Sequence, residues 1–197
     1  MWKFSGAENY MTTIEKEEIT NTLDKCRALI KLIKRSSILM EFLQETKQPF
    51  GINRQLVLDC ITRWNSTHYM IETFMLHKRV LLTLFDQKRL LPITKNQKDR
   101  LTDLEFSTDE WEILSILYRV LEPFSDATTF LSGSKYPTIG LCLFTIRTLQ
   151  EYLERDNSSE NPTTGKMRAL LAVAMHHYFD QNDEQFRFLK VRENYVS

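Results

Sequence analysis

The sequence predicts a mainly α-helical protein, on the evidence of its residue spacing and its composition. Apolar residues recur every three or four positions over long stretches, which places them on one face of a helix. Only 5 glycines and 5 prolines interrupt the 197 residues. With 42% hydrophobic residues, the chain can bury one packed core, or one core with a loosely attached piece. We therefore expect a multi-helix region.

The first predicted helix runs from about Thr13 to Thr46. A candidate capping box, Thr12 with Glu15, stands at its start, and Pro49-Phe50-Gly51 is expected to end it. Its apolar stripe, interpreted as a packing face, consists of Ile19, Leu23, Cys26, Ile30 and Ile33. This helix also carries the most basic stretch of the chain, with Lys25, Arg27, Lys31, Lys34 and Arg35. Such residues usually form the solvated side of a helix, and phosphate contact is the alternative.

The next stretch is expected to hold at most one short strand and a second helix. Residues 55–60 are apolar and partly β-branched, which permits a strand without proving one. Asn65 or Ser66 is expected to cap a helix that runs to Leu91-Pro92. The shared face of that helix carries Phe74, His77, Leu81 and Leu84. The polar residues 92–106 predict a surface loop.

The strongest helix start signal lies at Ser107. Ser107 and Glu110 have the spacing of a capping box, while Phe106 and Trp111 occupy the positions of a hydrophobic staple. The buried face of this helix is expected to contain Trp111, Leu114, Leu117, Tyr118 and Leu121. Because a proline inside a helix loses a hydrogen bond and clashes with the preceding turn, Pro123 is expected to kink or split it.

Two further helices are expected towards the C-terminus. Gly133 lies where a left-handed C-cap would close the preceding helix. Residues 136–155 predict a helix that opens at Tyr136-Pro137-Thr138 and carries Leu141, Phe144, Thr148 and Tyr152. Residues 156–165 read as a polar linker, and residues 166–179 as a last helix.

Charge and cysteine usage exclude several classes of protein. Lys and Arg total 26 and Asp and Glu total 26, so any contact with DNA has to be local rather than driven by net charge. No apolar run approaches the roughly 20 residues that span a bilayer, and no signal peptide is visible, so we expect an intracellular protein without membrane contact. Cys26, Cys60 and Cys142 include no Cys-x-x-Cys pair, which argues against a disulfide framework and a zinc site.

Two stretches resemble one family in order and spacing. The first, Leu58-Asp59-Cys60-Ile61-Thr62-Arg63-Trp64-Asn65-Ser66-Thr67, resembles the D-x-x-T-R-W-N-S-T signature of hAT transposases and of the BED-type zinc finger proteins descended from them. The second resembles that family's pattern of a tryptophan followed by L-x-P-F, A-T, L-S-G and Y-P-T. It comprises Glu110-Trp111, Leu121-Glu122-Pro123-Phe124, Ala127-Thr128, Leu131-Ser132-Gly133 and Tyr136-Pro137-Thr138.

The resemblance covers about residues 24–179 and implies one part of a larger enzyme. In hAT transposases a large all-helical insertion interrupts an RNase H-like core, and these motifs resemble that insertion, with a fringe of the core near residues 55–60. The family's three catalytic acidic residues lie before and after this region. The resemblance therefore implies a catalytically inactive, nuclear, transposon-derived fragment with no catalytic residue, no metal and no cofactor. We expect a flexible N-terminus at 1–12, the helical region at 13–180 and a tail at 181–197.

Arg63 and Trp64 are the candidate nucleic-acid-binding residues. An exposed indole can stack on an unpaired base while a neighbouring arginine binds a phosphate. The resemblance implies that this tryptophan stabilises a flipped-out base. The alternative is that Trp64 packs between helices and Arg63 pairs with Asp59. For Asp59 itself we expect a structural role, fixing the turn by accepting hydrogen bonds from nearby backbone or from Arg63.

Three functions remain open from the sequence, of which the least favoured is a working enzyme subunit that would need the three acidic residues from another chain. The first is residual DNA binding by an inactive transposase-derived fragment. The second is a helical protein–protein interaction module without DNA binding, which self-associates or binds a partner through exposed apolar faces. No metal site is expected at His68, His77, His176 or His177, because no cysteine or carboxylate set accompanies them at ligand spacing.

Overall fold

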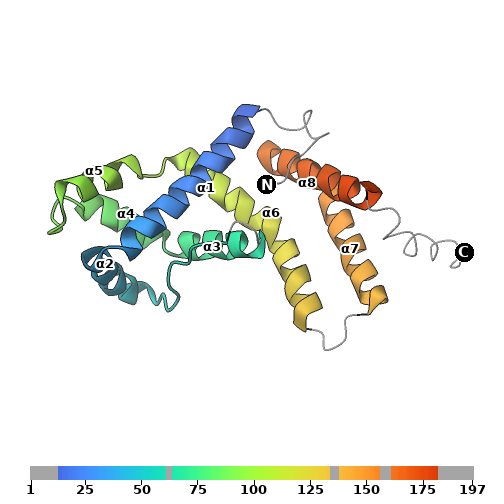
Figure 1. Ribbon diagram of the computed structural model, residues 1–197, viewed down its shortest axis with the longest axis horizontal. Coiled ribbons are helices and arrows are strands. Elements are labelled where there is room, and N and C mark those ends of the chain that lie inside the picture. Colours follow the sequence, from blue (N-terminus) through green and yellow to red (C-terminus); the bar gives the residue numbers. More distant parts are fainter. Residues whose placement is uncertain (1–12, 61–63, 134–137, 156–160, 182–197) are drawn as a thin grey trace, which may run out of the picture. The chain divides into compact units, whose positions relative to one another are not determined.

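The computed structural model describes residues 13–60, 64–133, 138–155 and 161–181 (Figure 1). The helices are α1 (Thr13–Lys34), α2 (Ser37–Lys47), α3 (Trp64–Leu76), α4 (Lys78–Gln87), α5 (Lys95–Asp103), α6 (Thr108–Gly133), α7 (Ile139–Glu154) and α8 (Pro162–Gln181), with a 3-10 turn η1 (Gln48–Phe50). The predicted mainly α class is confirmed. Across these described ranges there is no strand, and residues 55–60 have neither helix nor strand.

The chain forms two compact units. One is Glu17–Leu121, and the other combines Met1–Lys16 with Glu122–Ser197. The predicted flexible segment 1–12 and the tail after Gln181 lie outside the described residues. The division into 1–12, 13–180 and 181–197 stays a prediction.

The core of the Glu17–Leu121 unit is built from the apolar stripes of its helices. Burial of such side chains contributes about 25 cal/mol per Å² and is the main source of stability. Helix α2 packs against α4, and α3 also contacts α4. Completely buried side chains include Cys26, Leu29, Ile30, Ile33, Leu39, Met70, Ile71, Phe74, Val80, Leu81, Leu84, Leu101, Leu114 and Val120. The predicted inward face of Phe74, His77, Leu81 and Leu84 is confirmed.

The long first helix expected from the periodicity is wrong, because the chain breaks into α1 and α2 at Ser36. Ser36 is extended, with φ −118° and ψ 117°, and its hydroxyl accepts a hydrogen bond from the Leu39 N–H at 3.4 Å. A serine side chain that bonds the backbone in this way starts a helix rather than continuing one. The predicted end at Pro49-Phe50-Gly51 is confirmed. Gly51 has φ 64°, in the left-handed region that glycine adopts without steric cost.

The second predicted helix is also two helices, separated at His77. Helix α3 begins at Trp64, before the expected caps Asn65 and Ser66. Helix α4 begins directly after His77, whose backbone angles, φ −87° and ψ 5°, are not helical. The Nδ1 atom of His77 lies 2.7 Å from the Thr73 carbonyl. Burial lowers the pKa of His77, so its neutral form is favoured in the core.

The expected surface loop at 92–106 is wrong, because it contains α5. Thr94 and Gln97 form a complete capping box: the Thr94 hydroxyl accepts from the Gln97 N–H, and the Gln97 side chain accepts from the Thr94 N–H. Leu101 is the one completely buried residue of α5. A single buried side chain and a good cap therefore suffice for a helix whose polarity suggested a loop.

The start of α6 is confirmed in detail. The Ser107 N–H donates to Glu110 Oε2 at 2.7 Å, and the Glu110 N–H donates to Ser107 Oγ at 3.2 Å. The Phe106 and Trp111 rings lie 5.2 Å apart between centroids, as a hydrophobic staple requires. Helix α6 continues through Pro123, so the expected split does not occur. Gly133 is its last residue and is not left-handed, which corrects the C-cap prediction.

In the unit that contains Glu122–Ser197, α7 and α8 lie side by side. The Thr138 hydroxyl caps α7 by accepting from the Leu141 N–H at 3.2 Å. Helix α8 begins at Pro162, so the predicted linker 156–165 is wrong over its last residues. The Arg168 guanidinium donates to the Arg155 carbonyl at 2.8 Å, which satisfies a backbone acceptor at the end of α7.

No helix in the described part of the chain is both long and apolar enough to cross a membrane.

The capping box of α6 gives a direct stability prediction. We expect Ser107→Ala to lower the free energy of unfolding by about 1 kcal/mol, because the Glu110 N–H loses its acceptor. Urea denaturation followed by circular dichroism measures this. Thr108→Ala, one residue along and exposed, is the matched control and should change stability by less than about 0.5 kcal/mol. Equal losses in the two variants would contradict the assigned cap.

Candidate nucleic-acid interface

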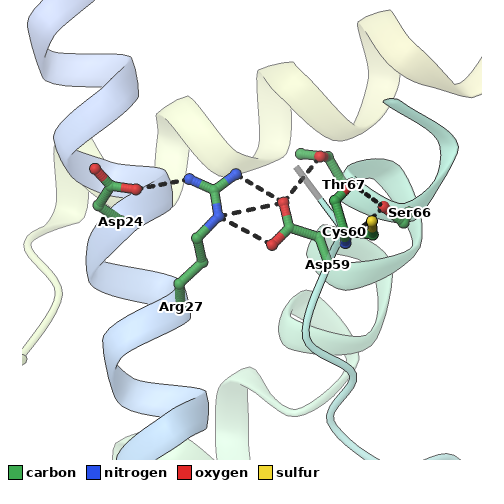
Figure 2. Close-up of polar contacts among 6 residues, drawn as sticks. All are labelled: Asp24, Arg27, Asp59, Cys60, Ser66 and Thr67. Carbon is green, nitrogen blue, oxygen red and sulfur yellow. Dashed lines mark hydrogen bonds and ion pairs between the residues drawn. The ribbon is translucent and has the colours of Figure 1, made fainter. Parts of the chain in front are cut away.

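An ion pair between α1 and the segment before α3 is the centre of the candidate site (Figure 2). Arg27 reaches Asp59 with two nitrogens: Nε lies 2.9 Å from Oδ1, and Nη2 lies 2.7 Å from Oδ2. The Thr67 hydroxyl donates to the same Oδ2 at 2.9 Å. The Asp59 side chain is only 1% exposed. Both carboxylate oxygens are therefore held, in the two-pronged geometry typical of strong arginine–carboxylate pairs.

Arg27 and Asp59 shift each other's pKa. Burial alone raises the pKa of Asp59, but the hydrogen bonds from Arg27 and Thr67 outweigh it and leave the pKa below its ordinary value. The hydrogen bond to Asp59 raises the pKa of Arg27, so both groups stay charged. At any pH above the lowered pKa of Asp59, the pair is thus an ionic link between α1 and the segment before α3.

A second contact joins the residues on either side of the Arg-Trp motif. The Ser66 hydroxyl accepts from the Cys60 N–H at 2.8 Å and lies 2.8 Å from the Cys60 carbonyl, to which it donates (Figure 2). The serine therefore satisfies both backbone groups of Cys60. Together with Asp59 and Thr67, this contact fixes the chain before residue 61 and after residue 65.

The two predicted site residues are only partly covered by the structure. Arg63 lies outside the described residues, and Trp64 is described only as the first residue of α3, without its side chain. Base stacking and the alternative of packing between helices both stay predictions. Asp59 has the structural role expected of it, with a further partner that the sequence did not indicate: the guanidinium of Arg27, 32 residues earlier. Sequence spacing could not reveal this contact, because it joins two separate elements. A contact between Asp59 and Arg63 stays a prediction, because Arg63 lies outside the described residues.

The basic stretch of α1 divides into paired and exposed residues. Lys25 forms an ion pair with Glu110 at 2.8 Å and lies over the Phe106 ring. Arg27 holds Asp59 and also Asp24. Lys31, Lys34 and Arg35 are exposed. Part of the stretch therefore stabilises the fold, and the rest remains accessible to a ligand.

The histidines make contacts other than metal ligation where the structure describes them. His68 is buried and stacks on Tyr118, with centroids 5.1 Å apart, and His176 lies 3.0 Å from Glu154. The side chain of His177 lies outside the described residues. Among the side chains that the structure covers, no group of three His, Cys, Asp or Glu could hold a metal ion. The three cysteines have free thiols, and Cys26 is buried.

A family model and two known proteins match part of the chain. Residues 9–120 match the family model of the ZBED1 RNase-like helical domain. A Zea mays protein named "Putative AC transposase" is 28% identical over 127 residues, which is 62% of this chain and 14% of that protein. Another, "Putative AC9 transposase" of Zea mays, is 25% identical over 142 residues, 62% of this chain and 17% of that protein. The chain thus matches less than a fifth of each relative's length. No solved structure matches it.

The contribution of the Arg27–Asp59 pair to stability can be measured by mutation. We expect Asp59→Asn to lower the free energy of unfolding by about 3 kcal/mol, because it leaves the partly buried Arg27 charge without its counter-charge. Combining it with Arg27→Gln should restore part of the loss, and urea denaturation of the four proteins gives the coupling energy.

Asp24→Asn is the matched control, since Asp24 binds the same guanidinium but its side chain is 64% exposed. It should cost less than about 1 kcal/mol. Because the pKa of Asp59 is lowered, its contribution is present above the ordinary aspartate pKa and is lost as pH falls through the lowered value. Asp59→Asn should remove this part of the acid dependence. Equal costs for the Asp24 and Asp59 variants would overturn the assignment.

Proposed function

The chain belongs to the ZBED1 RNase-like helical domain family of hAT transposase-related proteins, and we propose that this region binds DNA without cutting it. The matched residues 9–120 contain α1 to α5, the whole Asp59 site and the start of α6. The proposal concerns this region only, and it assigns the binding to Arg63 and Trp64. A nuclear location follows from DNA as the partner.

The observation that supports DNA binding is the double anchoring of the Arg-Trp motif. Asp59 and Cys60 are fixed before it, by Arg27 and Ser66, and Thr67 is fixed after it, by Asp59. A residue that stacks on a base needs a rigid frame, because ordering a loose segment on binding costs conformational entropy. An indole on such a frame stacks on unpaired bases with about 1–3 kcal/mol per base, whatever the base.

The proposed lack of cleavage rests on the state of Asp59 together with the family resemblance. Two-metal cleavage of DNA requires carboxylate oxygens that are available to cations. Both oxygens of Asp59 already accept hydrogen bonds, from Arg27 and Thr67, and a cation would have to break a buried ion pair to reach them. The resemblance places the family's three catalytic acidic residues outside this region.

DNA binding is tested by fluorescence anisotropy with labelled single-stranded and hairpin DNA at low and moderate salt. We expect Trp64→Ala to weaken binding by roughly tenfold, because one base loses its stacking partner. Trp64→Phe retains an aromatic ring and should keep most of the affinity. Arg63→Gln should lower the salt dependence of binding, because a phosphate contact is lost.

Two outcomes would contradict the proposal. Unchanged affinity in Trp64→Ala, with circular dichroism confirming a folded variant, would remove Trp64 from the interface. Nicking of the hairpin by the purified wild-type chain in the presence of Mg²⁺ or Mn²⁺ would show that the region is not inactive.

As a second candidate we propose a helical protein–protein interaction module. Large apolar side chains are exposed in the unit that contains Glu122–Ser197, namely Phe130, Ile139 and Phe144. Phe144 on α7 is 66% exposed. Exposed large apolar side chains are the material from which surfaces that bind another protein or a second copy of the chain are built.

This candidate predicts self-association that depends on Phe144. Multi-angle light scattering should show a mass that rises with wild-type concentration, and Phe144→Asp should reduce the rise. Leu90→Asp is the matched control, because Leu90 is 84% exposed and belongs to the other unit. A wild-type chain that stays monomeric at all concentrations would count against self-association.

A further inference from the structure

A positively charged hollow lies beside α1, away from the Arg-Trp motif in sequence. Its volume is about 320 Å³, and it is lined by Asp24, Arg27, Ala28, Lys31, Leu32, Arg35 and Arg100. Four of these seven residues are cationic and one is acidic. The whole chain is neutral, so this is a local concentration of positive charge.

Two helices contribute the charges. Arg27, Lys31 and Arg35 follow one another at four-residue spacing, and the Arg35 N–H continues the helical turn by donating to the Lys31 carbonyl at 3.2 Å. Residues four apart share one helix face. Arg100 comes from α5. The macrodipole at the C-terminal end of α1 favours cations there, but it does not account for a third cation arriving from another helix.

The carboxylate in the hollow does not neutralise this charge. Asp24 is bonded to Arg27 at 2.7 Å, and Arg27 is bonded to Asp59 as well. The side chains of Lys31, Arg35 and Arg100 form no ion pair with any residue in the described ranges. Like charges brought together repel one another, and a bound anion would remove this cost.

We infer that this hollow binds a backbone phosphate of DNA. Arginine presents planar, paired donors that match phosphate oxygens, and lysine adds a point charge. The site reads no base, so it acts on paired DNA, where stacked bases are not available to Trp64. The inference rests on the proposed function in taking DNA as the partner, but it uses a separate set of residues.

Arg27 connects this site to the first one. Its guanidinium faces Asp24, which lines the hollow, through Nη1, and faces Asp59 through Nε and Nη2 (Figure 2). The hollow and the anchored ends of the Arg-Trp motif therefore belong to one compact unit, Glu17–Leu121. A DNA molecule held at the hollow therefore contacts α1, the helix whose Arg27 also binds Asp59.

The test uses the full chain and a fully paired, labelled DNA duplex, with the affinity measured over a range of salt concentrations. The variant Lys31→Gln, Arg35→Gln, Arg100→Gln removes the three unpaired charges. Losing the contact with one phosphate makes the plot of log K against log salt less steep by about 0.9, so we expect a change of roughly 0.9 in the slope. At moderate salt the affinity should fall at least about tenfold.

The matched control removes the same charge elsewhere in the unit, with Arg79→Gln, Arg89→Gln and Lys95→Gln, all exposed. This control should keep the wild-type slope to within about 0.3, well below the change of about 0.9 that one lost phosphate contact produces. Equal losses in both triple variants would overturn the inference, because net charge would then explain the binding. Displacement of the duplex by inorganic phosphate, beyond the effect of NaCl at equal ionic strength, would also overturn it in favour of a free-phosphate site.

The two proposals can fail separately. Loss of duplex binding in the hollow variant, with Trp64→Ala still binding single strands normally, would support the hollow and refute the role of Trp64. The reverse result would refute the hollow alone.

Discussion

The buried ion pair between Arg27 and Asp59 is the constraint on which the arrangement of the candidate site depends. It joins the middle of α1 to the irregular segment that precedes α3, where neither helix nor strand hydrogen bonds hold the chain. A charged pair is a costly way to fix a loop, because both groups lose their hydration. The two parallel hydrogen bonds of the pair offset this cost by fixing both the distance and the relative orientation of the two side chains, whereas an apolar contact would leave their orientation free. Two hydroxyls add nearby hydrogen bonds: that of Thr67 binds the Asp59 carboxylate, and that of Ser66 binds the backbone of Cys60.

Local signals in the sequence predicted local structure well. The start of α6 needs only residues 106–111, which are close neighbours along the chain, and both the capping box and the staple are present. The sequence did not predict the breaks at Ser36 and His77, because the apolar periodicity continues across both. The spacing of apolar residues does not show where the backbone hydrogen bonds of a helix end. Helix α5 was missed for the opposite reason, since its polarity hides the single buried Leu101.

The candidate site was only partly accessible to such reasoning. The motif at residues 58–67 indicated a candidate segment by resemblance, and the structure shows which contacts hold its described residues. Arg27 is 32 residues away from Asp59, and nothing in the spacing of either residue indicates the other. The charged hollow depends in the same way on Arg100 of α5, which lines it together with residues more than 60 positions earlier in the chain. Tertiary contacts of this kind require the packing of whole helices to be known.

The cysteines differ in exposure, so Cys60 beside Asp59 can be labelled selectively with a thiol reagent. Cys26 is completely enclosed in the core, where burial raises the pKa of its thiol, and the thiolate is the form that reacts with alkylating reagents. Cys60 is exposed and directly follows Asp59, three positions before Arg63. Cys142 is half-buried, and replacing it with serine would leave one accessible thiol. A fluorophore or spin label attached there would report on the motif from within the segment that Arg27 holds in place.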